Sequence, residues 1–390
     1  MRILDRLIDR LFVCLYLAIA ALPVAAMVGR WGDHRLEGAV HAPPRPALSL
    51  SAVRSEDYQA RLTAWFEVKH GLRNGSIWID NTILYHAFHE TKWASDVVIG
   101  NDDVLFQRDD IGYFNKQGAE LPDARDFDLL ANRIAALQLR LARDHRALVP
   151  MFVPSKTTIF PDEVPAQWTR DLGSPRPSTE RVYLAMKRAL DAHRVVYIDG
   201  IALLLGSPEP RDRLWGPSAR HFSDYAGCLC TREVVRRYAE LTGRPGFDYP
   251  CQVELRKPSG RPRDLDLFRL LNAWGAGYDP VERDVRHDPL PAEPPPGAPS
   301  VLWIASSFGW TTMDDAVGSR RFGALDLDYY HRSVHAAGTR ESFDPAQRDA
   351  RWRSVFLGRD IYVLELFETY LSPSYFGADA IDAIAAELGP

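Results

Sequence analysis

The stretch Val301-Leu-Trp-Ile-Ala-Ser-Ser-Phe-Gly309 decides the fold of this chain. Five apolar residues end abruptly in small and polar ones, a pattern typical of a buried strand that runs into a tight turn. Ser307 stands where such a turn places a nucleophile, beside backbone N–H groups that polarise a reacting carbonyl. A buried strand with a merely polar turn has the same pattern, so the remaining sequence must decide between the two interpretations.

Helical and strand patterns alternate on both sides of this stretch, because apolar residues at helical spacing are followed by short apolar runs. This order predicts an α/β fold with a mostly parallel sheet. Ser307 then lies at the carboxyl end of a strand, where such folds carry their sites. The predicted helices cover 127–141, 178–193, 231–243 and 378–388, and the predicted strands cover 148–153, 195–199, 301–305 and 361–366.

The composition is that of a folded, globular chain. Of 390 residues, 46% are hydrophobic and 11% are aromatic, and the formal net charge is -5. This is enough apolar material for one large core or two smaller ones. The arginines are scattered among aspartates and glutamates instead of forming a basic block, so a nucleic-acid partner is not expected.

The N-terminus differs from everything after it. Leu11 to Val28 contains no charged residue, and at about 1.5 Å per residue it spans about 27 Å, close to a hydrocarbon core. Arginines at positions 2, 6 and 10 favour a cytoplasmic N-terminus. We expect a single-pass anchor in a bacterial inner membrane, with the C-terminal domain in the periplasm. A cleaved signal peptide is the alternative, because small residues stand at 21–26.

Prolines at positions 43, 44 and 46 indicate a short linker after the apolar segment. The predicted organisation is therefore an anchor or signal peptide at 1–30, a linker at 31–55 and one folded domain at 56–390.

Three of the four cysteines lie outside the apolar segment. In an oxidising compartment Cys251 pairs with either Cys228 or Cys230, which leaves one thiol free. The cysteine spacing does not match a zinc site, and the histidine pairs at 86/89 and 331/335 have no evident third ligand. Neither a metal nor an organic cofactor is expected.

Several sequence blocks, in one order, resemble the alginate O-acetyltransferase family (AlgJ/AlgX-like, with an SGNH-hydrolase-like domain). The resemblance covers about residues 60–370 and implies an SGNH-hydrolase-like, flavodoxin-like α/β fold. The blocks are Gly71-Leu-Arg-Asn74, Gly100-Asn-Asp-Asp-Val-Leu-Phe106, Val153-Pro-Ser-Lys-Thr-Thr-Ile-Phe-Pro161, Arg220-His-Phe222, Ala305-Ser-Ser-Phe308 and Val363-Leu-Glu-Leu-Phe-Glu368.

The resemblance implies that Ser307 is the nucleophile and His221 the base that takes its proton. The family has an aspartate two residues before this histidine, and Ala219 stands there in this chain. An orienting carboxylate fixes the histidine tautomer, and its loss in a serine triad costs about four orders of magnitude in turnover. Asp224 and Asp212 are the candidates to replace it.

Three further residues are candidates for contact with substrate. Lys156 lies in the family-like Pro-Ser-Lys turn and is expected to meet an anionic sugar or donor. Trp215 and Trp310 flank the proposed catalytic residues in sequence and are expected to stack on sugar rings.

The function that the resemblance implies is O-acetylation of hydroxyls on an exopolysaccharide, alginate-like or cellulose-like, through an acyl-serine. A multi-pass membrane acyltransferase supplies the acetyl group, and other exopolysaccharide assembly proteins are partners. Two alternatives stay open: a carbohydrate acetyl esterase that uses the same residues, and a catalytically degenerate subunit that binds polysaccharide or serves as a scaffold.

Overall fold

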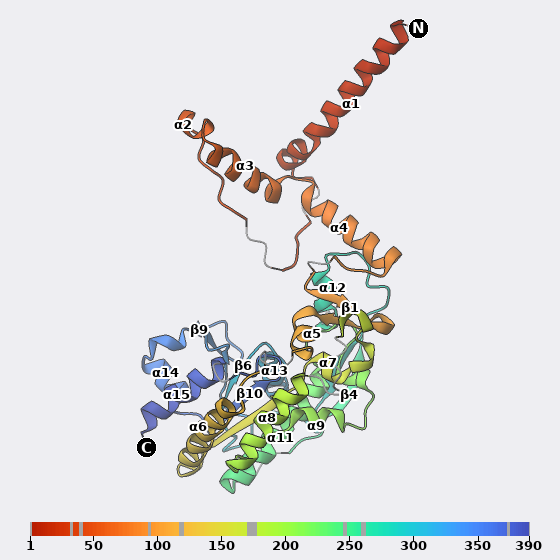
Figure 1. The fold of residues 1–390 in the computed structure, drawn as a ribbon. Helices are drawn as coiled ribbons and strands as arrows, with labels where there is room; N and C mark the ends of the chain where they lie inside the picture. The colour runs from red at the N-terminus through yellow and green to blue at the C-terminus, as the bar shows by residue number, and fades with distance from the viewer. Residues whose placement is uncertain are drawn as a thin grey trace. The chain divides into compact units, whose positions relative to one another are not determined.

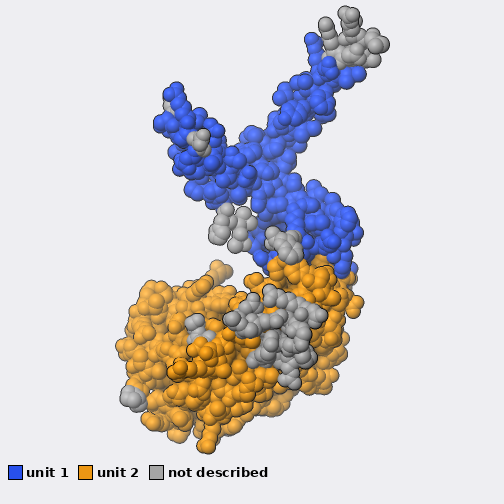
Figure 2. Space-filling view, in the orientation of Figure 1, with its two compact units in different colours: residues 1–97, 268–278 blue, residues 98–267, 279–390 orange. Residues whose placement is uncertain are grey.

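The structure is a computed structural model that describes residues 2–31, 34–38, 42–92, 95–116, 121–169, 178–244, 248–258, 263–372 and 375–389. The chain forms two compact units, shown in blue and orange in Figure 2. The first contains residues 1–97 and 268–278, and the second contains residues 98–267 and 279–390. Residues 56–88 form helices of the first unit.

The first unit is helical. Its long helix α1 (Arg2–Gly29) contains a segment, Leu7–Gly29, that is long and apolar enough to cross a membrane, with 6% of its most apolar window buried. Membrane anchors and signal sequences share these properties, so both alternatives from the sequence stand. The other helices are α2 (Leu50–Val53), α3 (Glu56–Lys69), α4 (Arg73–Ile83) and the π-helical turn η1 (Leu84–Phe88).

The second unit contains a six-stranded sheet with the order β3-β10-β6-β7-β8-β9. Figure 1 labels three of its strands, β6, β9 and β10. The first four strands in this order are parallel, and β8 and β9 are antiparallel to their neighbours. The predicted mostly parallel sheet is therefore confirmed. The strands are β3 (Ala147–Val153), β6 (Val301–Ala305), β7 (Leu325–Tyr329), β8 (Ser333–Ala336), β9 (Ser342–Phe343) and β10 (Ile361–Phe367).

Side chains of successive residues in β6 enter two different cores. Val301, Trp303 and Ala305 belong to one buried cluster, and Leu302 and Ile304 belong to the other. This alternation follows from the two-residue period of a strand, and both faces are apolar because helices cover both. The first cluster includes residues of α11 (Asp224–Thr242) and α13 (Phe308–Ser319), and the second those of α6 (Ala124–Ala142), α8 (Ser178–Ala192), α14 (Ala350–Phe356) and α15 (Phe376–Leu388).

The remaining elements are short. Two small sheets pair β1 (Val97–Ile99) with β2 (Leu105–Gln107), and β4 (Gln252–Arg256) with β5 (Glu282–Arg286). The short helices are α5 (Arg108–Phe114), α7 (Lys156–Ile159), α9 (Gly200–Leu205), α10 (Arg211–Leu214) and α12 (Asp266–Leu270), and the 3-10 turns are η2 (Asn101–Asp103), η4 (Pro161–Glu163), η5 (Ala166–Trp168), η6 (Arg263–Leu265) and η7 (Pro345–Gln347).

Two sequence predictions are corrected by the structure. The segment 195–199 is not a strand of the sheet, because only Ile198 forms an isolated bridge, to Met151. The helix predicted to begin at Thr231 begins at Asp224, where the Ser223 hydroxyl accepts the Ala226 N–H as its cap. Its predicted end at Gly243 is confirmed by a left-handed residue there.

The predicted disulfide is present between Cys228 and Cys251. It ties α11 to the segment that leads into β4. Cys230 is the free, buried thiol of the alternative pairing.

Two buried glutamates at the end of β10 hold the ends of the neighbouring strands. Glu365 accepts the backbone N–H of Ser306 at 3.1 Å, beyond the end of β6. Glu368 accepts the backbone N–H of Ser155 and the hydroxyl of Thr158, both at 2.5 Å, beyond the end of β3. Burial raises the pKa of each carboxyl to about 7, although these hydrogen bonds act in the opposite direction.

The glutamate pKa values predict how stability depends on pH. The Glu365 carboxyl has an ordinary pKa of 4.5 and a folded pKa of about 7, so between these values the unfolded chain holds fewer protons and stability falls as pH rises. Glu365→Gln keeps the acceptor for Ser306 and removes this proton. We expect the loss of unfolding free energy between pH 5 and 7.5 to shrink by about 2 kcal/mol, measured by denaturant titration of the full chain in detergent.

The matched control is Glu341→Gln, whose side chain is 73% exposed. It should follow the pH dependence of the wild type. Parallel pH profiles for Glu365→Gln and the wild type would contradict the raised pKa.

Candidate active site

Ser307 lies between the end of β6 and the start of α13, as the sequence predicted for a strand-to-helix turn. The close approach of α13 to the sheet requires Gly309. A Cβ at that position would lie 2.6 Å from the Cβ of Ala305 and 2.6 Å from Leu327 Cδ1. The glycine therefore lets the helix begin directly at the strand end, which fixes the position of Ser307.

His221 lies in the turn before α11 and contacts Ser307 directly. The distance from its Nε2 to Ser307 Oγ is 2.7 Å. Its ring meets the Phe308 ring edge-on, with 4.9 Å between centroids. The structure therefore brings together the two predicted catalytic side chains, which are 86 residues apart in sequence.

Asp266 completes a chain of hydrogen bonds behind His221. Its Oδ2 lies 3.0 Å from His221 Nδ1. Its Oδ1 accepts the backbone N–H groups of Arg220 at 2.5 Å and Leu267 at 2.8 Å. A carboxylate at Nδ1 assigns the proton to that nitrogen, which leaves Nε2 free to accept the Ser307 hydroxyl proton.

Neither predicted replacement for the family aspartate serves His221. Asp224 is paired with Arg263 at 2.7 Å, and Asp212 lies 3.6 Å from Arg213. Sequence reasoning missed Asp266 because it comes 45 residues after the histidine. The available signal was a single acidic residue inside the apolar run Leu265-Asp-Leu-Phe268.

Lys156 is buried, and the predicted contact with substrate is corrected. Its Nζ donates to the backbone carbonyls of Gly216 at 2.8 Å, Pro217 at 2.5 Å and Ala219 at 3.0 Å. Burial lowers the pKa of Lys156 to about 7, against the opposing effect of the Asp266 and Asp264 carboxylates. Three carbonyl acceptors match the three N–H donors of an ammonium, so Lys156 fixes the turn that leads to His221.

The two candidate tryptophans differ in exposure. Trp215 is fully buried, with its ring against Phe222 and Phe308, so it offers no face to a sugar. Trp310 is half-buried, and its ring lies beside those of Tyr329 and His335.

A polar cavity of about 240 Å³ reaches His221. Its wall includes Ala219, His221 and the charged side chains of Arg263 and Asp284. Its charged lining suits a hydrophilic group, and Ser307 is not among the lining residues.

The backbone N–H of Ser307, at the start of α13, is a candidate oxyanion donor. The backbone N–H of Ser307 donates no hydrogen bond to any of the residues that the structure describes. A free N–H at a helix start carries a partial positive charge, which stabilises an oxyanion formed next to Ser307 Oγ.

One group of described residues approaches the arrangement of a metal site: Cys228, His287 and Asp315 place one ligand atom each within 4.8 Å of one another. The Cys228 sulfur is bonded to Cys251 and is not available as a thiolate ligand. His331 is hydrogen-bonded to Asp328 at 2.7 Å, away from this group. The catalytic arrangement uses none of these residues.

No family model and no curated protein sequence matches the chain. Several solved structures are similar to it, among them the following three. The O-acetyltransferase domain of Pseudomonas putida AlgJ has a TM-score of 0.45 at 15% identity, and covers 74% of this chain and 99% of its own. Pseudomonas aeruginosa AlgX has a TM-score of 0.45 at 12% identity, and the match covers 73% of this chain and 67% of AlgX. Bacillus cereus PatB1 with a sulfonyl adduct has a TM-score of 0.41 at 10% identity, and the match covers 72% of this chain and 96% of PatB1.

At these identities the similarity carries no argument about the activity of this chain, which must come from its own site. AlgJ and AlgX, the proteins whose sequence blocks this chain resembles, are among the structures similar to it.

Proposed function

We propose that this chain is an O-acetyltransferase that forms an acyl-serine at Ser307 and passes the acetyl group to a polysaccharide hydroxyl. The observation that supports this most directly is the unbroken chain of contacts from Ser307 Oγ through His221 to Asp266. A serine is a weak nucleophile by itself, and a histidine held in the correct tautomer by a carboxylate is what activates it.

In the first half of the reaction, His221 Nε2 takes the Ser307 proton while Oγ attacks the carbonyl carbon of an acetyl donor. The Ser307 N–H stabilises the oxyanion of the tetrahedral intermediate. As that intermediate collapses, protonated His221 gives its proton to the leaving group, and the acetyl group stays on Ser307.

In the second half, a sugar hydroxyl takes the place of the leaving group. His221 removes its proton, the sugar oxygen attacks the acyl carbonyl, and Ser307 Oγ leaves with the proton from His221. Asp266 keeps its charge throughout and stabilises the imidazolium in both halves. The half-buried Trp310, three residues after Ser307, is the candidate to stack on the acceptor sugar.

The finer parts of the proposal rest on the sequence blocks and on α1. The acceptor is an exopolysaccharide, alginate-like or cellulose-like, and the reaction takes place in the periplasm. The acetyl donor is presented by a multi-pass membrane acyltransferase, and other exopolysaccharide assembly proteins act alongside.

Two other functions use the same fold. A carbohydrate acetyl esterase would use the same three residues with water in place of the sugar hydroxyl. A degenerate binding or scaffold subunit would not need Ser307, His221 and Asp266 to meet. The assembled contacts favour an enzyme over a scaffold, since the carboxylate missing at Ala219 is supplied by Asp266.

We expect the full chain in detergent to release product from a chromogenic acetyl ester and to gain the mass of one acetyl group. Ser307→Ala should abolish the mass adduct, because the acyl bond has no oxygen to form on. His221→Ala should lower the rate by at least about 10³-fold. Intact-protein mass spectrometry and product absorbance measure both effects.

The control for this experiment is Ser342→Ala at the exposed end of β9, which should behave as the wild type. A folded wild type that shows neither the adduct nor turnover would contradict the enzyme proposal and favour a binding or scaffold function. Addition of uronate or glucan oligosaccharides separates transferase from esterase: a transferase acetylates the sugar, whereas an esterase releases acetate at an unchanged rate.

The role of Asp266 predicts a specific loss. Asp266→Asn keeps the size of the side chain but favours the wrong histidine tautomer, so turnover should fall by about 10³- to 10⁴-fold with little change in KM. Asp212→Asn, at the aspartate that the structure places with Arg213, should leave turnover within about twofold of the wild type. Equal effects of the two substitutions would show that Asp266 does not act through His221.

A further inference from the structure

The surface of α1 requires an apolar environment. Its large hydrophobic side chains, such as Phe12 at 69% and Val28 at 79%, are exposed to a degree unusual for a folded protein in water. Trp31 lies two residues after the end of the helix and is 59% exposed. A tryptophan at the end of an apolar helix lies at the level of lipid headgroups.

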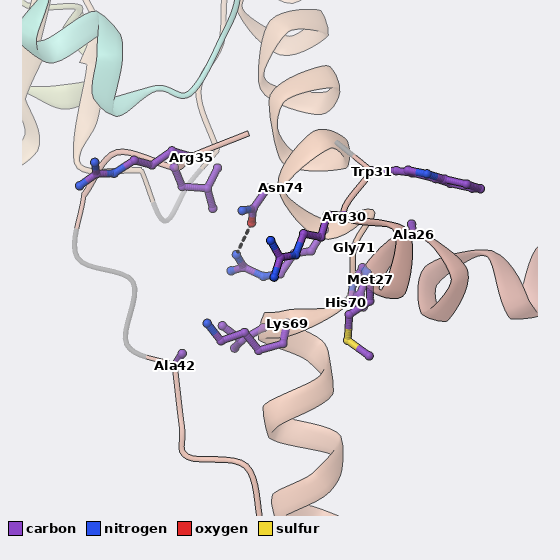
Figure 3. A pocket seen from close by; sticks show the side chains of 13 residues that line it. Ala26, Met27, Arg30, Trp31, Arg35, Ala42, Lys69, His70, Gly71 and Asn74 are labelled. Atoms are coloured by element: carbon purple, nitrogen blue, oxygen red, sulfur yellow. Dashed lines mark hydrogen bonds between the residues drawn. The ribbon is translucent and has the colours of Figure 1, made fainter. Parts of the chain in front are cut away.

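A cavity of about 580 Å³ lies at this same end of α1. Four cationic side chains line it, and no carboxylate does. Figure 3 shows Arg30, Lys69 and Asn74 gathered on one side of the helix end, whereas Trp31 extends away from them. The cationic residues are Arg30, Arg35, Lys69 and Arg73.

These four charges have no anionic partner among the residues that the structure describes. Arg73 Nη1 donates to the amide oxygen of Asn74 at 3.3 Å, which is a neutral acceptor. Like charges that share one space repel each other, and an anion bound among them removes that repulsion. The cavity therefore has the electrostatics of an anion site.

Backbone contacts hold the two sides of the cavity together. Gly71, in the turn between α3 and α4, donates its N–H to the carbonyl of Pro23 in α1 at 3.2 Å. A side chain at position 71 would overlap the backbone of Ala26 and Met27. The turn that carries Lys69 and Arg73 is thus docked on the last turns of α1, next to Arg30.

We propose that this cavity binds the headgroup of an anionic phospholipid. The phosphodiester oxygens accept hydrogen bonds from Arg30, Lys69 and Arg73, and the acyl chains lie along the exposed apolar side of α1. The source of the phosphate is the membrane, since the cavity lies at the level of Trp31. Because residues of α1 line the cavity, only a chain that retains α1 has this site. The proposal is independent of the proposed acetyl transfer.

Native mass spectrometry of the full chain tests this, after the intact mass has shown that α1 is present. The protein in a neutral detergent receives equal amounts of phosphatidylglycerol and phosphatidylcholine with the same acyl chains. The wild type should retain one phosphatidylglycerol in preference to phosphatidylcholine. Arg30→Gln with Arg73→Gln should weaken this binding about 30-fold, at about fivefold for each charge removed.

The matched control is Arg61→Gln on the surface of α3, whose arginine already pairs with Asp57 at 2.9 Å. It should keep the lipid preference. Equal retention of the two lipids by the wild type, or an unchanged preference in the double variant, would overturn the proposal. Displacement of the lipid by millimolar inorganic phosphate would overturn it as well, because the site would then take a free phosphate instead of a lipid.

Discussion

The hydrogen bonds from Lys156 to three backbone carbonyls are the constraint on which the geometry of the candidate active site depends. A buried ammonium is costly unless each of its N–H groups finds an acceptor, and the turn at 216–219 supplies all three. This turn belongs to no helix or strand, so it lacks the ladder that usually fixes a backbone. The lysine therefore connects the end of β3 to the segment that presents His221.

The triad itself joins three segments that are fixed in three different ways. Ser307 is set by β6 and the close start of α13, His221 by the turn that Lys156 holds, and Asp266 by two backbone N–H groups. These contacts hold the three segments in addition to the hydrogen bonds between the three side chains. This explains how a carboxylate from a distant segment can replace the one expected at Ala219: His221 Nδ1 needs an acceptor in the right place, whatever its position in sequence.

The sequence predicted the features that depend on residues close together in the chain. The buried strands at 148–153 and 301–305 are continuous apolar runs, and the strand at 361–366 is apolar except for Glu365. The Ser307 turn follows directly from one of them. It could not predict Asp266, because that contact depends on the folded path over 45 residues. β7 was missed because Asp326 and Asp328 interrupt its apolar pattern, yet both are buried and paired with Arg359 and His331. The burial of Trp215 is likewise a tertiary property that sequence position alone does not reveal.

Gly309 has a consequence for how related sequences are to be compared. The sheet and α13 need a residue without a Cβ at this position whether or not the chain performs chemistry, so a descendant that had lost its activity would still be selected to keep it. His221 and Asp266 are polar and partly exposed, and their side chains contact each other. In related sequences, the presence of both residues would therefore indicate activity better than the Ser-Phe-Gly motif does.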